Sequence, residues 1–317
     1  MSPVYEPVAP EEIDEAARRI AGTIVRTPLV RLPVDGTAEI FLKLENLQPI
    51  GSFKLRGAGN ALAHVDSGEL AEGVWTASAG NMAQAVAWHA RERGVPCTVV
   101  VPETAPSTKL DAVERLGGKL VKVPYPTWIE VFRTRAYPGL NGVFVHPFSD
   151  AAVMAGNATI GAEIAADLPD VDAVLVPYGG GGLSCGIGSA LHGRCRVYAC
   201  EIETAAPLSA SLAAGEPVEI EHRHSFVDGI GAPTVFPEMF ALARQLLEGS
   251  IVVGLDAVAK SIRLLAERAR VVAEGAGAAS VAAALSGRAG EGKLVCVVSG
   301  GNIDLPVLQT ILGGKTP

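Results

Sequence analysis

Short apolar segments alternate with amphipathic segments along most of the chain. Runs of apolar and β-branched residues predict strands at 39–44, 74–77, 97–101, 120–123, 173–177, 196–201 and 294–298. Helical spacing of apolar positions, often ended by glycine, predicts helices at 10–22, 82–93 and 107–116 and another after the glycines at 179–182. Strands that alternate with helices are typical of parallel sheets covered on both faces, so we expect an α/β fold.

The length of the chain and its turn residues indicate two lobes. The 317 residues are enough for two hydrophobic cores, and the segments "VPYPTWIE" and "AYPGLNG" punctuate the middle of the chain. Near them we place the return from a smaller to a larger lobe. The expected large domain is 1–66 plus 147–317, and the expected small domain is 67–146. Segment 216–233 has no clear period, and so long a loop is often functional.

Composition excludes several classes of function. A net charge of −8 gives no basic surface for nucleic acid, and no apolar stretch reaches the roughly 18–20 residues of a membrane span. The acidic N-terminus lacks the features of a secretion signal. Five cysteines without a CxxC pair fit free thiols in a reducing compartment. We therefore expect a cytoplasmic protein with neither nucleic-acid nor membrane partners.

The segment "VLVPYGGGGLSCGIG" predicts an anion site. A buried strand runs into four glycines, Gly179, Gly180, Gly181 and Gly182, and then into a helix that begins near Leu183. Backbone N–H groups of such a loop, with the helix N-terminus behind them, suit a phosphate. The spacing fits neither G-x-G-x-x-G nor a Walker P-loop. The structural alternative is a tight turn between a packed strand and helix.

Three further segments carry candidate chemistry. "GSFKLRGA" places Lys54 in the first turn of a predicted helix, and "TASAGNMAQ" offers Ser78 and Asn81 with free backbone N–H groups for a carboxylate. "VCVVSGGNIDL" brings Ser299 to the end of a strand, where ligands bind in open α/β sheets. Taken alone, each of the last two could be an ordinary cap or turn. A lysine able to form an imine, a phosphate loop, a carboxylate loop and a hydroxyl together indicate a pyridoxal 5'-phosphate site, with a nearby helix terminus helping to keep the released amine of Lys54 neutral.

In their order and spacing, "GSFKLRGA", "SAGN", "GGGGL", "VVAEGAGA" and "SGGNIDL" resemble the motifs of the fold-type II pyridoxal-phosphate enzymes, above all the threonine/serine dehydratases and serine racemases. The likeness runs from about Pro28 to Leu305. It implies two open parallel-sheet α/β domains with the cofactor in the cleft between them, and a homodimer. The cofactor-binding residues it implies are Phe53, Lys54, Asn81, Gly179, Gly180, Gly181, Gly182, Leu183, Gly229, Glu274 and Ser299. The implied substrate-binding residues are Ser52, Ser78, Ala79, Gly80, Asn81 and Met82.

The expected reaction is β-elimination from a β-hydroxy amino acid, with L-threonine or L-serine first, to a 2-oxo acid and ammonia. By the resemblance, Ser299 faces the ring nitrogen and leaves it largely unprotonated, which favours expulsion of a β-leaving group. Lys54 is the expected base. The alternatives are a dehydratase for 3-hydroxyaspartate or another substituted serine, with Arg133 or Arg135 as the additional cation, and then an amino-acid racemase. From another class, a non-catalytic phosphate- or nucleotide-binding protein would use the glycine run alone.

Departures from the family pattern narrow these expectations. Ala79 stands where the racemases carry the serine that acts as second acid and base, so racemisation is disfavoured. Pro207 stands where some relatives place an aspartate that binds a divalent ion with the glutamate matching Glu201, and we expect no metal. The loop histidines His222 and His224 and the helical His89 are expected to face solvent. Of the cysteines, only Cys185, after the glycine run, lies near the expected site.

Overall fold

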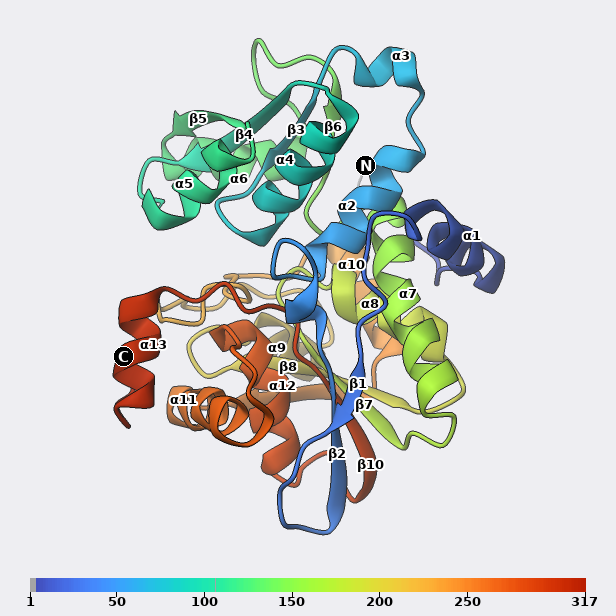
Figure 1. Cartoon of the computed structure of the whole chain (residues 1–317), viewed down its shortest axis with the longest axis vertical. Coiled ribbons are helices and arrows are strands. Elements are labelled where there is room, and N and C mark those ends of the chain that lie inside the picture. Colours follow the sequence, from blue (N-terminus) through green and yellow to red (C-terminus); the bar gives the residue numbers. More distant parts are fainter. Residues whose placement is uncertain (1–3, 106) are drawn as a thin grey trace.

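The computed structural model describes residues 4–105 and 107–317, which form two sheets of different size. Within these residues the larger sheet has the order β1-β2-β10-β7-β8-β9 and the smaller one β5-β4-β3-β6 (Figure 1). The larger sheet contains β1 (Leu29–Arg31), β2 (Ala38–Lys43), β7 (Ala173–Pro177), β8 (Arg196–Ile202), β9 (Gly249–Val253) and β10 (Gly292–Val297). The smaller contains β3 (Val74–Ala77), β4 (Cys97–Pro102), β5 (Lys119–Val123) and β6 (Val143–Phe144). Every paired strand is parallel to its neighbour except β1, which is antiparallel to β2.

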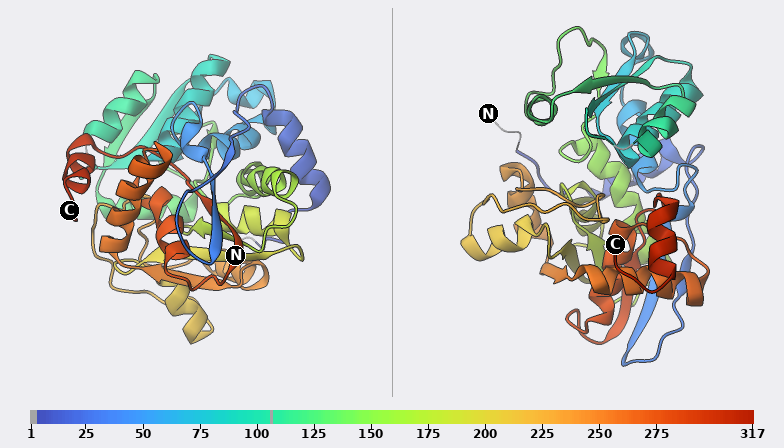
Figure 2. Two further views of the ribbon diagram at one scale, coloured as in Figure 1. Left: turned by 60° about the horizontal axis from the view of Figure 1, so that its bottom comes forward. Right: turned by 90° about the vertical axis from the view of Figure 1, so that its left-hand side faces the viewer.

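Helices cover both sheets (Figure 2). Those of the first half are α1 (Pro10–Ile20), the short turn η1 (Glu45–Leu47), α2 (Lys54–Ala63), α3 (Ser67–Leu70), α4 (Asn81–Arg93), α5 (Ser107–Arg115), α6 (Tyr125–Thr134) and α7 (Ala151–Asp167). Those of the second half are α8 (Gly182–Leu191), α9 (Pro207–Ala214), α10 (Pro237–Leu246), α11 (Leu255–Leu264), the π-helical turn η2 (Leu265–Ala269), α12 (Gly275–Leu285) and α13 (Leu305–Leu312). None of the helices in the described ranges has the length and apolar character needed to cross a membrane.

Alternation along β7 shows how the larger sheet is sandwiched. Leu175 belongs to the apolar cluster that contains the alanines of α12, whereas Val174 and Val176 belong to the cluster with Ile160 of α7 and Ile187 of α8. Successive side chains of a strand point to opposite faces, so both faces of β7 are buried. The expected α/β class with open parallel sheets is confirmed.

The sequence pattern located most of these elements and missed four. β3 and β7 have the predicted bounds, whereas β1, β6, β9 and α6 were not predicted. Segment "VPYPTWIE" is not a simple turn, because α6 begins within it and carries Pro126 in its first turn. Proline is tolerated there, since the N–H groups of the first turn have no partner within the helix.

The fold brings the candidate loops to one end of each sheet. The loop that contains Ser78 follows β3, the glycine run follows β7, and Ser299 lies just beyond β10. All strands of the smaller sheet lie between β2 and β7 in the sequence, as the expected division into domains requires. The carboxyl ends of parallel strands thus gather the residues considered next.

Candidate active site

Lys54 is buried at the start of α2. Its Nζ lies 2.5 Å from the main-chain oxygen of Pro147, to which it donates, and 5.1 Å from the centroid of the Phe53 ring. Burial lowers the pKa of Lys54 from 10.5 to about 8, against the opposing effect of the negative charge of Glu274. A helix terminus was expected to keep this amine neutral, but removal from water is the main cause. An appreciable part of Lys54 is therefore a neutral amine near neutral pH.

The start of α2 is tied to the end of β10. The backbone N–H of Phe53 donates to Ser299 O at 3.0 Å, and Ser52 pairs with Gly300 in an isolated β-bridge. The Ser52 hydroxyl accepts from the N–H of Lys54 at 3.4 Å. Ser299 is buried, and its hydroxyl makes no hydrogen bond within the described residues. The lysine and the serine predicted from separate motifs therefore lie side by side.

Asn81, Glu274 and Asn302 form a chain of hydrogen bonds beside Lys54. The Asn81 amide donates to Glu274 Oε1 at 2.9 Å, and the Asn302 amide donates to Asn81 Oδ1 at 2.8 Å. A Cβ on Gly300 would lie 2.5 Å from Glu274 Oε1, and one on Gly229 would lie 3.5 Å from the same oxygen. Asn302 was not among the predicted site residues, although it follows Ser299 closely in the quoted motif.

The loop between β3 and α4 presents backbone donors. The Ser78 hydroxyl accepts from the N–H of Gly80 at 3.2 Å, and α4 begins at Asn81. The N–H groups of Asn81 and Met82 donate to no group in the described part of the chain. The Met82 side chain is buried in the core of the smaller lobe, so only its main chain can reach a ligand. With the methyl group of Ala79 between them, these groups suit a carboxylate.

The glycine run leaves its N–H groups unpaired. Those of Gly180, Gly181, Gly182 and Leu183 donate to no group within residues 4–105 and 107–317, and α8 begins immediately after Gly181. Gly181 has φ 91°, a left-handed conformation that favours glycine. A Cβ on Gly180 would overlap the Phe148 ring at 2.2 Å. The loop is thus a concave set of donors at a helix N-terminus, which fits the phosphate predicted for it.

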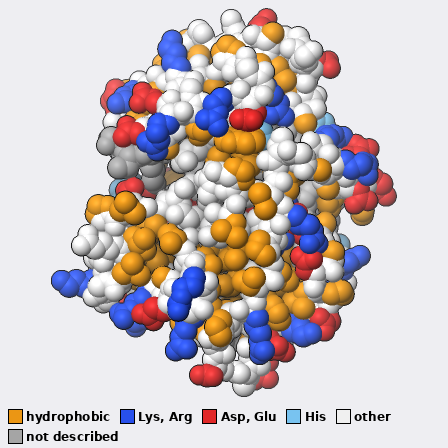
Figure 3. All heavy atoms as spheres, viewed as in Figure 1, with side chains coloured by type: hydrophobic (Ala, Val, Ile, Leu, Met, Phe, Trp, Pro, Cys, Tyr) orange, Lys and Arg blue, Asp and Glu red, His pale blue; other side chains and the backbone are white. Residues whose placement is uncertain are grey.

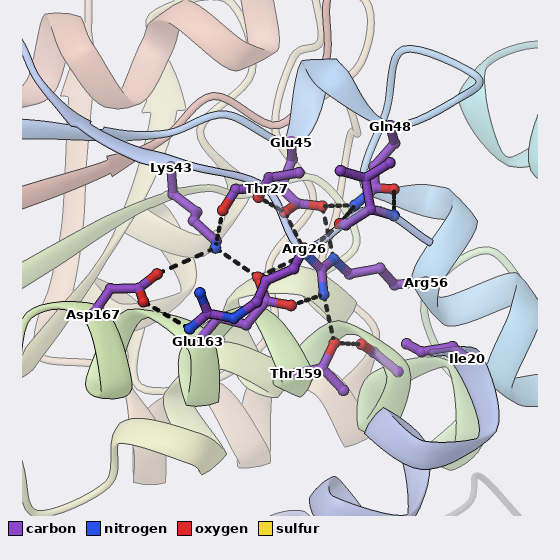
Figure 4. A network of polar contacts seen from close by, with 12 residues as sticks. Ile20, Arg26, Thr27, Lys43, Glu45, Gln48, Arg56, Thr159, Glu163 and Asp167 are labelled. Atoms are coloured by element: carbon purple, nitrogen blue, oxygen red, sulfur yellow. Dashed lines mark hydrogen bonds and ion pairs between the residues drawn. The ribbon is translucent and has the colours of Figure 1, made fainter. Parts of the chain in front are cut away.

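A buried ionic network lies beneath Lys54 (Figure 4). Arg56, two residues along α2, donates to both carboxylate oxygens of Glu45 at 2.8 and 2.9 Å and to both of Glu163 at 2.7 and 2.9 Å. Lys43 Nζ, fully buried on β2, donates to Glu163 at 2.6 Å and to the Thr27 carbonyl at 2.7 Å. Two cations balance two carboxylates, so the network joins β2, η1, α2 and α7 without an unpaired charge.

The expected solvent exposure of His89 is wrong. His89 is fully buried, and its Nε2 lies 2.8 Å from the Leu55 carbonyl, while Arg93 approaches its Nδ1 at 3.0 Å. Burial lowers the pKa of His89 to about 4. No local pattern in the sequence indicates this burial, because α2 and α4 meet only in the folded chain, where Gly59 leaves room for the imidazole.

Glu201 has a structural role at the position considered for a metal. Its carboxylate accepts from the N–H groups of Leu208 and Ser209, both at 2.8 Å, and from the Ser250 hydroxyl at 2.6 Å. It therefore caps α9, whose first turn contains Pro207. No group of three or more potential ligands is found within the described residues.

The other candidate side chains lie outside this arrangement. The rings of His222 and His224 are 5.1 Å apart in the loop after α9. Burial raises the pKa of the Cys185 thiol to about 12, so it is a packing residue. Arg133 is exposed, and exposed Arg135 donates to the Ser149 carbonyl at 2.7 Å.

Comparison with known proteins places this arrangement among others. A family model described as pyridoxal-phosphate dependent enzyme matches residues 20–300. The chain is 40% identical over 312 residues to the L-threonine ammonia-lyase of Thermotoga maritima, an alignment that covers 95% of this chain and 77% of that protein. It is 36% identical to the L-threonine dehydratase catabolic TdcB of Escherichia coli K12, with 97% of both chains covered. Maize serine racemase superposes with a TM-score of 0.89 at 30% identity, covering 98% of both chains. A threonine deaminase from the source abbreviated T.th. superposes with 0.86 at 33% identity, covering 94% of this chain and 99% of that one.

Proposed function

Because this chain belongs to the family of pyridoxal-phosphate dependent enzymes, we propose that it is an ammonia-lyase that dehydrates and deaminates L-threonine or L-serine. The products are a 2-oxo acid and ammonia. The membership confirms the resemblance predicted from the motifs and identifies pyridoxal 5'-phosphate as the cofactor. The choice of reaction is supported by relatives at 36 to 40% identity whose names specify threonine ammonia-lyase or threonine dehydratase.

The observation that carries the proposal is the environment of Lys54. A buried lysine whose pKa is about 8 stands beside Ser299 and Glu274. The unpaired N–H groups of the glycine run fit a phosphate, and the exclusion of a Cβ at Gly180 marks how closely this loop packs. The residues present therefore fit the cofactor.

Each predicted site residue receives a role in this proposal. Bound pyridoxal phosphate supplies an aldehyde that condenses with amines and a ring that withdraws electrons from the substrate. Lys54 holds the cofactor and, as a free amine, removes the proton from the substrate α-carbon. Other cofactor contacts are assigned to Phe53, Asn81, Gly179, Gly180, Gly181, Gly182, Leu183, Gly229, Glu274 and Ser299. Substrate contacts are assigned to Ser52, Ser78, Ala79, Gly80, Asn81 and Met82, the last through its main chain.

Two other reactions have less support. A 3-hydroxyaspartate dehydratase needs a cation for the second carboxylate, whereas Arg133 is exposed and Arg135 is engaged by Ser149. A racemase needs a proton donor on the side of the cofactor away from Lys54, and Ala79 has none. The lyase reaction requires neither group, and it is therefore preferred.

We further propose a cytoplasmic homodimer. In the view of Figure 3, hydrophobic side chains gather over the larger lobe. The exposed large apolar residues of the chain include Leu47, Val272, Leu305 and Leu312. Exposed apolar surface of this kind is typical of protein interfaces. Sedimentation of the purified protein tests this, with a monomer at micromolar concentration as the contrary result.

The proposed reaction is tested by 2-oxo-acid release from threonine, serine and 3-hydroxyaspartate by the purified protein with added pyridoxal phosphate. Release from threonine or serine is expected. Borohydride reduction, followed by mass analysis of the Lys54 peptide, shows whether the cofactor is bound there. A labelled peptide without turnover would contradict the lyase reaction. An unlabelled lysine would favour the phosphate-binding alternative.

A further inference from the structure

The buried histidine His146 has no role in the reaction proposed above. It lies between β6 and α7, is 1% exposed, and its imidazole packs at 4.6 to 6.1 Å between ring centroids against Phe132, Phe144, Phe148 and Phe236. Such an aromatic setting alone would suit a phenylalanine equally well. The hydrogen bonds of the imidazole explain why a histidine is useful here.

One ring nitrogen of His146 closes a tight turn. Its Nδ1 accepts from the backbone N–H of Phe148 at 3.2 Å and from that of Ser149 at 2.9 Å. A nitrogen that accepts hydrogen bonds carries no proton, so the neutral ring has its proton on Nε2. Burial, with the charges of Arg135 and Lys54, lowers the pKa of His146 to about 3, so the acceptor persists at all ordinary pH values.

The turn presents a carbonyl to the catalytic lysine. The N–H of Phe148 and the carbonyl of Pro147 belong to one peptide unit, which is planar. Fixing the N–H therefore fixes the direction of the carbonyl, and that carbonyl accepts from Lys54 Nζ at 2.5 Å. Pro147 also has a restricted φ, which removes a further degree of freedom.

From this geometry we infer that His146 is a positioning residue for Lys54, because it holds the peptide unit whose carbonyl receives the Lys54 amine. It touches neither cofactor nor substrate in this role. The assignment rests on the proposed function only in giving Lys54 its task. The Ser149 end of the turn is held independently, since its hydroxyl donates to Glu238 at 2.8 Å and its carbonyl accepts from Tyr5 at 2.8 Å.

Two substitutions separate positioning from packing. His146→Asn places its Oδ1 the same number of bonds from Cα as the imidazole Nδ1, so it keeps the acceptor and loses the aromatic packing. His146→Phe keeps the packing and loses the acceptor. A merely structural role predicts that His146→Phe is closer to the natural protein, and a positioning role predicts that His146→Asn is.

The first readout does not need a substrate. Apo-protein is mixed with pyridoxal phosphate, and its attachment to Lys54 is followed by visible absorbance and by the mass of the borohydride-reduced peptide. We expect slower attachment and a kcat lowered roughly 100-fold, with little change in KM, for His146→Phe, because a small displacement of a catalytic group has effects of that size. His146→Asn should stay closer to the natural protein in both. Equal or better performance of His146→Phe would overturn the inference.

A measurement on the unmodified protein covers the case in which the variants do not fold. Nitrogen NMR of the histidine rings should show a non-titrating His146 with Nδ1 unprotonated and the proton on Nε2. A proton on Nδ1 would overturn the inference. If the natural protein binds the cofactor at Lys54 but releases no 2-oxo acid, the proposed function fails. The comparison of cofactor attachment then still decides the role of His146.

Discussion

At Lys54, burial and a neighbouring charge act on the same amine in opposite directions. Loss of water favours the neutral form, whereas the carboxylate of Glu274 favours the ammonium form, and burial is the larger effect. The resulting pKa of about 8 suits a group that must attack an aldehyde and later accept a proton. Glu274 is itself held by Asn81, so its charge has a fixed place.

This balance predicts how cofactor attachment depends on pH. Only the neutral amine reacts, so the rate at which apo-protein takes up pyridoxal phosphate should rise with pH through about 8 and then level off. Glu274→Gln removes the charge that raises the pKa of Lys54, and the midpoint should move to lower pH. Glu267→Gln, on the exposed π-helical turn, serves as the control. A midpoint near 10.5, the ordinary lysine value, would contradict this account.

Ala79 carries the prediction on stereochemistry. A methyl group cannot transfer a proton, so the natural protein should produce little D-serine from L-serine, as measured by chiral chromatography. Ala79→Ser supplies a hydroxyl at the position where related racemases carry a serine, and we expect it to gain racemisation. Ala83→Ser, one helical turn along in the buried face of α4, is a control for the added hydroxyl. Efficient racemisation by the natural protein would refute the argument.

At the scale of elements, α2 depends on partners outside itself. It has no side-chain cap at its N-terminus, and Gly57 and Gly59 lower its intrinsic helix propensity. Gly59 is required because a Cβ there would lie 2.7 Å from His89 Nε2. Arg56 anchors the first turn through Glu45 and Glu163. The helix that carries Lys54 is therefore held by tertiary contacts rather than by its own sequence.

Removing Arg56 should lower the free energy of unfolding substantially. Arg56→Met leaves the buried carboxylates of Glu45 and Glu163 short of a counter-charge, and breaking such a pair costs about 3–5 kcal/mol. Urea denaturation of the apo-protein measures the difference. Arg26→Met is the matched control, because Arg26 pairs with Asp167 at the edge of the same network with 57% of its side chain exposed. That change should cost less than about 1 kcal/mol. Equal costs for the two variants would show that burial of the network does not matter.

At the scale of the whole molecule, the range of the interactions decides what the sequence could predict. The glycine run, Lys54 and Ser299 could be predicted because each lies in a local motif at a strand or helix end. The contact between Arg56 and Glu163 spans 107 positions, and that between Lys54 and Pro147 spans 93. No local pattern encodes such pairs, so His146 and the ionic network emerged only from the fold.

The segment that joins the two lobes is also where they are fastened together. Arg135, at the end of α6 in the smaller lobe, donates to the Ser149 carbonyl, and Ser149 in turn donates to Glu238 of α10 in the larger lobe. Tyr5, from the N-terminal segment, donates to the same carbonyl. Three parts of the chain thus converge on the residue that follows Phe148.

This convergence predicts a local effect of Arg135→Ala. Loss of the guanidinium removes one of the two donors to the Ser149 carbonyl, and we expect faster amide hydrogen exchange in residues 143–150 than in the natural protein. Exchange in the central strands of both sheets should not change, because their hydrogen bonds do not involve Arg135. Arg133→Ala removes an exposed arginine from the same helix and should leave the segment as it is. Since Pro147 receives Lys54 within this segment, faster exchange there should accompany a lower kcat. Faster exchange spread over the whole smaller lobe would instead mean that Arg135 stabilises that lobe rather than its connection to the larger one.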